Sequence, residues 1–97
     1  MAYSISRRLT IVGRVEIQER AAKYTEAVLA QLNAEISAAG TDVKSLAGRL
    51  QMDYNTFRRY TIGERPMPMT VLWSALEALG VDEVVFIDRA KARNEGR

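Results

Sequence analysis

A short polar group in the middle of the chain carries the side chains best suited to specific recognition: Tyr54, Asn55, Arg58 and Arg59. Residues three and four positions apart lie on the same side of a helix, so in a helix these four share one face while Phe57 anchors the opposite face in a core. Asparagine can form two hydrogen bonds with adenine, and arginine can do the same with O6 and N7 of guanine. Residue types and spacing therefore predict contact between this face and the edges of DNA bases.

The composition argues against catalytic and metal chemistry. The 97 residues contain no cysteine and no histidine, which excludes thiolate metal sites and cysteine nucleophiles and removes the commonest general base and metal ligand. The acidic group of Asp82, Glu83 and Asp88 is interpreted as a helix cap and a solvated helix face. We therefore expect no enzymatic activity, no catalytic residue, no metal and no cofactor.

Length and charge fit one small DNA-binding domain. The chain is 47% hydrophobic and 27% charged, with a net charge of +2, which is ordinary for a globular protein. Basic residues exceed acidic ones over residues 41–65, and arginine, which suits two-pronged contacts with guanine and phosphate, outnumbers lysine. No apolar run approaches the roughly 18–20 residues that span a bilayer, and residues 1–8 lack the features of a secretion signal. We expect a cytoplasmic protein with no membrane contact.

Hydrophobic periodicity predicts a series of helices around the polar group. Residues 9–17 fit the alternation of a strand as well as a helix weakened by Gly13, and both alternatives stay open. Gly40 is expected to end the first clear helix, Thr41 to cap the second, Asp53 the third and Asp82 the fifth. The helices are expected over about residues 24–39, 41–50, 54–60, 69–79 and 82–92, with a loop over 62–68.

The expected fold is all-α, a compact bundle of about five helices that contains a helix-turn-helix. This motif consists of two short helices joined by a tight turn, and its second helix enters the major groove of DNA. Residues 26–93 are assigned to the DNA-binding domain, residues 1–25 to an N-terminal extension and residues 94–97 to a frayed tail.

Three segments resemble the lambda-repressor-like helix-turn-helix family, to which the Cro and XRE proteins belong. They are the run SLAGRLQMDYNTFRRY over residues 45–60, the loop GERP over 63–66 with Pro68 after it, and the later pattern Val71-Leu72, Ala75-Leu76 and Leu79-Gly80-Val81. The resemblance covers about residues 27–90.

The sequence departs from this family's pattern at two positions. Members usually have a glycine at the sharp turn where this chain has Gln51, so the turn must accommodate a side chain. They also often have a glutamate where this chain has Thr61.

The resemblance implies roles for residues of this chain and names double-stranded DNA as the partner, with no small-molecule ligand. The positions where members contact bases correspond to Tyr54, Asn55 and Arg59. The positions near those that contact phosphates correspond to Thr41, Lys44, Arg58 and Arg65.

An apolar run near the C-terminus exceeds what one short helix can turn toward a single core: Val84, Val85, Phe86 and Ile87. One interpretation is a self-association surface, because in the resembled family this helix often serves dimers. The other is burial against the N-terminal segment, and the two can coexist.

The expected function is sequence-specific DNA binding by a transcriptional regulator similar to a small bacteriophage repressor or Cro-type regulator. Such a protein would act in the cytoplasm of a bacterial host as a homodimer. It would occupy a roughly palindromic operator and so block a promoter. Two alternatives stay open: an antitoxin-type autorepressor that also binds a protein partner, and an interaction adaptor that does not bind DNA.

Overall fold

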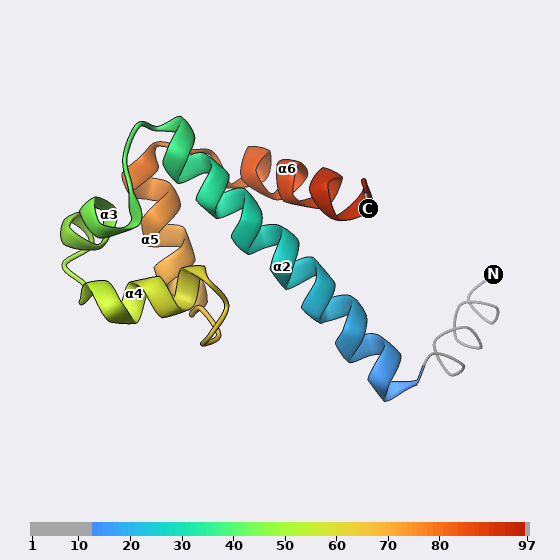
Figure 1. Ribbon diagram of the computed structural model, residues 1–97. Coiled ribbons are helices and arrows are strands. Elements are labelled where there is room, and N and C mark those ends of the chain that lie inside the picture. The colour runs from blue at the N-terminus through green and yellow to red at the C-terminus, as the bar shows by residue number, and fades with distance from the viewer. Residues whose placement is uncertain (1–12, 97) are drawn as a thin grey trace.

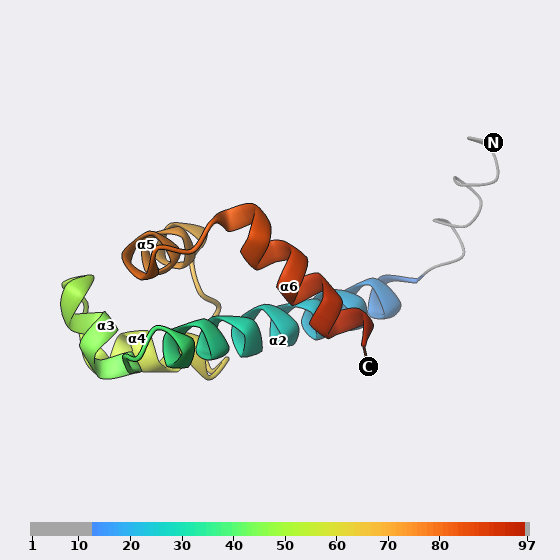
Figure 2. The ribbon, with the colours of Figure 1, turned by 90° about the horizontal axis from the view of Figure 1, so that it is seen from above.

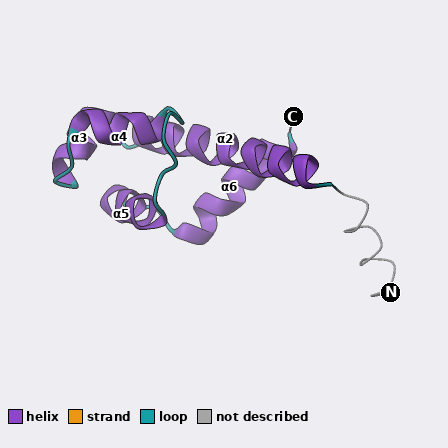
Figure 3. Cartoon of the chain, turned by 90° about the horizontal axis from the view of Figure 1, so that it is seen from below, coloured by secondary structure: helices purple, strands orange, loops and turns teal. Residues whose placement is uncertain are grey.

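The computed structural model describes residues 13–96, and within this range the chain forms five α-helices and no strand (Figure 1, Figure 3). The all-α prediction is confirmed. Helices α2, α3 and α4 lie in one layer, and α5 and α6 lie in the other (Figure 2). The helices are α2 (Arg14–Ala38), α3 (Val43–Arg49), α4 (Tyr54–Thr61), α5 (Met69–Leu79) and α6 (Glu83–Glu95).

Helix α2 decides between the two conformations left open near the N-terminus. It begins at Arg14 and runs for 25 residues, so residues 14–17 are helical, while residues 9–12 lie outside the described range. The N–H of Gly13 donates to Oε1 of Glu16 at 2.9 Å, which satisfies a backbone donor that precedes the first turn. The helix passes through position 25, the expected domain boundary, without a break.

Only the C-terminal half of α2 belongs to the bundle. Ala27, Leu32 and Ile36 are buried, whereas residues 13–23 are exposed and extend beyond the other helices (Figure 1). The radius of gyration is 15.9 Å, compared with about 12–13 Å for a compact chain of this length. A projecting helix end therefore sets the shape of the molecule.

The chain reversal between α2 and α3 corrects one predicted cap. Gly40 has a φ of 73°, and the N–H of the next residue, Thr41, donates to the carbonyl oxygen of Ile36 at 3.2 Å. Thr41 thus closes α2, as in other helices that end on a left-handed residue. The cap of α3 is Asp42, whose Oδ1 accepts from the N–H of Ser45 at 2.7 Å, so the prediction of Thr41 as the cap is wrong.

The boundaries of α4 and α5 and the start of α6 agree closely with the prediction, whereas α2 begins at Arg14 and not near residue 24 as expected. Asp53 and Asp82 cap α4 and α6, each accepting from a backbone N–H three residues ahead. Helix α5 occupies the predicted residues and ends at Gly80, with a φ of 72°. Helix α6 continues to Glu95, farther than expected. Local cap chemistry is strong enough here to set most helix ends.

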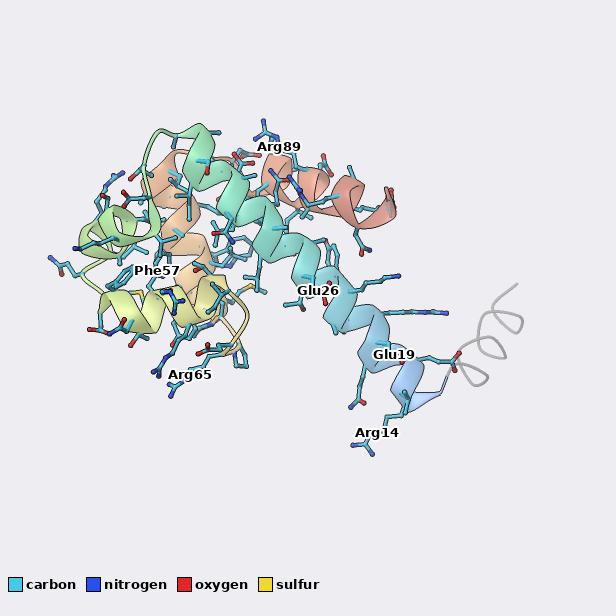
Figure 4. All side chains as sticks on the ribbon, viewed as in Figure 1. Arg14, Glu19, Glu26, Phe57, Arg65 and Arg89 are labelled. Atoms are coloured by element: carbon cyan, nitrogen blue, oxygen red, sulfur yellow. The ribbon has the colours of Figure 1, made fainter. Side chains whose placement is uncertain are left out.

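The core lies between the two layers and takes a fully buried side chain from every helix. These side chains are Leu32 of α2, Leu46 of α3, Phe57 of α4, Leu76 of α5 and Phe86 of α6. Phe57 points from α4 toward the other helices (Figure 4). The buried ring of Phe57 therefore packs α4 against the core of the bundle.

A polar network joins α2 to α6 beside this core. Oε2 of Glu35 accepts from Nε2 of Gln31 at 2.8 Å and from Nη1 of Arg89 at 2.7 Å. Oε1 of Gln31 accepts from Nε of Arg93 at 3.1 Å. Burial by itself raises the pKa of Glu35, but the hydrogen bonds from Arg89 and Gln31 and the charge of Arg89 hold that pKa below its ordinary value.

Candidate nucleic-acid interface

The turn between α3 and α4 is tight, with a glutamine at its sharpest point. Gln51 has a φ of 57° and is the one non-glycine residue with a positive φ in the described range. Its N–H donates to the carbonyl oxygen of Gly48 at 3.1 Å, and the N–H of Met52 donates to that of Ala47 at 2.9 Å. The prediction that this turn must accommodate a side chain is confirmed, and the left-handed backbone costs about 1–2 kcal/mol.

The inward side of α4 is fixed to both the core and α2. Phe57 is buried, as predicted for this face, and Thr61 is buried beside it. The hydroxyl of Thr61 donates to the carbonyl oxygen of Arg58 at 2.9 Å, so this buried polar group has a partner. Nδ2 of Asn33 on α2 donates to the carbonyl oxygen of Thr61 at 3.1 Å, which satisfies one of the carbonyls left open at the helix end.

The outward side of α4 holds the four polar residues predicted to recognise DNA. Tyr54 is 41% exposed, and Asn55, Arg58 and Arg59 are also exposed. They lie within two turns of one helix, so the structure brings the predicted base-contacting residues together. The opposite burial of Phe57 fixes which way this face points.

The loop after α4 places two charged side chains next to this face. The carbonyl oxygen of Arg59 accepts from the N–H groups of Glu64 and Arg65, at 2.9 and 3.3 Å. The side chain of Arg65 points away from the bundle (Figure 4). Arg65 therefore lies beside the end of α4, as a residue that contacts phosphate near the recognition helix would.

The remaining predicted phosphate contacts lie at the start of α3. Thr41 is half-buried just before this helix, and Lys44 is exposed in its first turn. The carboxylate of Asp42 stands between them. Hydrogen bonds from the backbone and side chain of Ser45, together with the charge of Lys44, hold the pKa of Asp42 below its ordinary value. This end of α3 carries both signs of charge, so Lys44 is the weaker of the predicted cationic contacts.

The four predicted interface residues of α6 divide into two kinds. Phe86 is fully buried in the core, so it is a packing residue and is withdrawn from the predicted self-association surface. Ile87 is half-buried, whereas Val84 and Val85 are 68% and 40% exposed. Burial against α2 and the core accounts for part of the apolar run, and a dimer through the exposed valines stays a prediction.

Three arginines outside the predicted contact set have partners within the fold. Nη1 of Arg49 donates to the carbonyl oxygen of Ala78, near the end of α5, at 2.8 Å. Arg89 and Arg93 are engaged by Glu35 and Gln31. No pattern in the sequence marks these pairs, because the partners are 29 to 62 positions apart.

Glu64 is a neighbour of the outward face of α4 that was not among the predicted site residues. Its Oε1 lies 3.7 Å from Nε of Arg59. The Gly63-Glu64 pair directly after a helix could have indicated this position, because a left-handed glycine brings the following residue back toward the last turn of the helix.

Two features are absent from the part of the chain that the structure describes. Over residues 13–96 no three acidic side chains gather as a metal site would require. Among the helices described, none is long and apolar enough to cross a membrane. No family model, curated protein or solved structure matches this chain.

Proposed function

We propose that this protein binds double-stranded DNA through α4 and represses transcription by occupying an operator. The observation that carries the proposal is the division of α4 into two faces. Asn55, Arg58 and Arg59 are exposed on one face, while Phe57 is buried on the other. With α3 and the turn over residues 50–53, α4 forms a two-helix unit. In such a unit the second helix alone enters the major groove, while the first crosses the DNA backbone.

The exposed groups suggest a division of labour on DNA. Tyr54, Asn55 and Arg59 are proposed to contact base edges, because amide and guanidinium groups match adenine and guanine. Thr41, Lys44, Arg58 and Arg65 are proposed to contact phosphates, which position a protein on the duplex but carry no sequence information.

Repression would follow from occupancy of the operator alone. Two copies, proposed to join through Val84 and Val85, would recognise a roughly palindromic site, which requires their α4 helices to lie about 34 Å apart, one helical turn of DNA. By the resemblance to phage repressors, we propose the cytoplasm of a bacterial host as the place of action. No ligand is required for this mechanism.

The test is selection of bound duplexes from a randomised pool near physiological salt, followed by affinity measurements on the enriched sequence. Enrichment of a palindrome supports specific, dimeric binding, whereas a single half-site supports DNA binding and argues against the dimer. Binding that is only general and salt-sensitive, with no enriched sequence, refutes the proposal.

Two variants with a matched control assign the contacts. Arg59→Ala is expected to cost about 1–3 kcal/mol on the enriched site and to relax selection at one base pair. Arg65→Ala is expected to weaken binding to all duplexes alike and to lower the salt slope by about one. Lys91→Ala removes the same charge from the exposed surface of α6, in the other layer, and should change neither property. An Arg59→Ala protein that retains full selectivity would show that α4 is not the recognition helix.

A further inference from the structure

The backbone after α4 holds Glu64 in a fixed position beside Arg59. Gly63 has a φ of 83°, which a side chain would strain, and its N–H donates to the carbonyl oxygen of Tyr60 at 3.2 Å. The N–H of Glu64 then donates to the carbonyl oxygen of Arg59 at 2.9 Å. Two backbone hydrogen bonds and a left-handed glycine therefore return the chain onto the last turn of α4.

This backbone places the carboxylate of Glu64 next to the guanidinium of Arg59. Oε1 of Glu64 lies 3.7 Å from Nε of Arg59, and the two side chains are 60% and 48% exposed. An ion pair this exposed adds little to stability, about 0–1 kcal/mol. The effect of this ion pair therefore lies in the orientation of the Arg59 side chain and in the charge around it.

The point of contact on Arg59 leaves its recognition edge available. The guanidinium is planar and rigid, with five N–H donors. The contact is to Nε, whereas end-on recognition of O6 and N7 of guanine uses the other edge, formed by Nη1 and Nη2. A carboxylate on the Nε side thus attracts the guanidinium without competing for the atoms that would meet the base.

The negative charge of Glu64 has a second effect, on the binding of DNA duplexes whose sequence differs from the operator. Arg58, Arg59 and Arg65 would otherwise present an uninterrupted basic surface to any phosphate backbone. A carboxylate among them weakens this attraction for every duplex, while a matched duplex regains affinity through the oriented arginine. Specificity is a difference between two affinities, and a local repulsion can increase it.

We propose that Glu64 is a specificity-determining residue: it holds the Arg59 guanidinium end-on for a guanine and weakens binding to unmatched duplexes. This inference rests on the proposed DNA binding through α4. It adds that the operator contains a guanine at the position read by Arg59, and that this preference depends on a residue outside the recognition helix.

The test compares affinities for three duplexes: the sequence enriched by the wild-type protein, the same sequence with the Arg59-dependent guanine pair changed to adenine–thymine, and an unrelated duplex of equal length. A two-pronged arginine–guanine contact discriminates by about 5- to 150-fold. Glu64→Gln is expected to lower the guanine preference about threefold or more and to tighten binding to the unrelated duplex about twofold. Glu77→Gln, at an exposed position of α5, makes the same change of charge and should leave the preference intact.

A coupled variant separates orientation of Arg59 from a general effect on the fold. In an Arg59→Ala background, Glu64→Gln is expected to leave the ratio between the guanine and adenine duplexes unchanged, because no guanidinium is left to orient. An equal loss in both backgrounds, or a wild-type preference in the Glu64→Gln protein, overturns the role of Glu64. A wild-type protein that selects no duplex at all refutes the proposed function instead, so the two failures are distinguishable.

Discussion

Removing Arg89 is the sharpest test of how α6 is held to α2. The side chain of Glu35 is only 6% exposed and accepts hydrogen bonds from Arg89 and Gln31. A methionine at position 89 keeps much of the length of the side chain but removes one charged donor and leaves the carboxylate with Gln31 alone. We expect Arg89→Met to lower the free energy of unfolding substantially, for the reason that a buried charge has lost its partner.

The size of the effect follows from the geometry of the pair. A hydrogen bond to a charged group contributes about 1.5–3 kcal/mol, and the 54% exposure of the Arg89 side chain argues for the middle of that range, about 2 kcal/mol. For a domain of this size such a loss lowers the melting temperature by about 8–16 °C. Lys91→Met, on the exposed side of α6, should change the free energy of unfolding by less than about 0.5 kcal/mol.

A second substitution tests whether the change in free energy of unfolding has the expected sign. Glu35→Gln in the Arg89→Met background replaces the buried carboxylate by a neutral amide that still accepts from Gln31. The double variant should therefore be more stable than Arg89→Met alone, by about 1 kcal/mol. Urea denaturation followed by circular dichroism at 222 nm measures five proteins: wild type, Arg89→Met, Glu35→Gln, the double variant and the Lys91→Met control. A double variant whose loss equals the sum of the two single losses would refute the idea of a buried, paired charge.

Three further predictions concern pH, the sharp turn and the projecting helix. The pKa of Glu35 is lowered in the folded state, so the stabilisation from its charged form is complete above the unfolded pKa of about 4.3 and is lost as pH falls through the lower folded pKa. The difference in free energy of unfolding between wild type and Glu35→Gln should therefore shrink between pH 6 and pH 3, and a constant difference would contradict this. Gln51→Gly should raise the free energy of unfolding by about 0.5–1 kcal/mol, because glycine removes the strain of the left-handed backbone but loses more entropy on folding. A loss of stability in urea titrations would show that the glutamine side chain contributes to the turn. Amide hydrogens over residues 18–23 should exchange at least about 100-fold faster than the amide hydrogen of Leu32, because a helix end without tertiary contacts is marginal in water. Equal protection, measured by NMR, would indicate that something covers the projecting half of α2.

The sequence by itself determined the helices and most of their ends. Capping by Asp53 and Asp82, and termination by Gly40 and Gly80, depend on residues within one turn of the boundary, so a local pattern contains the necessary information. The division of α4 into a buried Phe57 side and a polar side is equally local, because it follows from the helical period. The start of α2 could not be predicted with the same certainty, because residues 9–17 satisfy two periods at once.

Only the packing of the helices determines which arginine and apolar side chains are engaged within the fold and which are exposed at the surface. Arg49, Arg89 and Arg93 look like Arg58 and Arg65 in the sequence, but the first three donate to oxygens of other helices. Likewise, Phe86 and Val84 belong to one apolar run, and only the packing of α6 against the core separates the buried ring from the exposed valine. The physical reason is common to both cases. Charge and hydrophobicity belong to the residue, whereas the acceptor or cavity that engages it is supplied by residues tens of positions away in the chain.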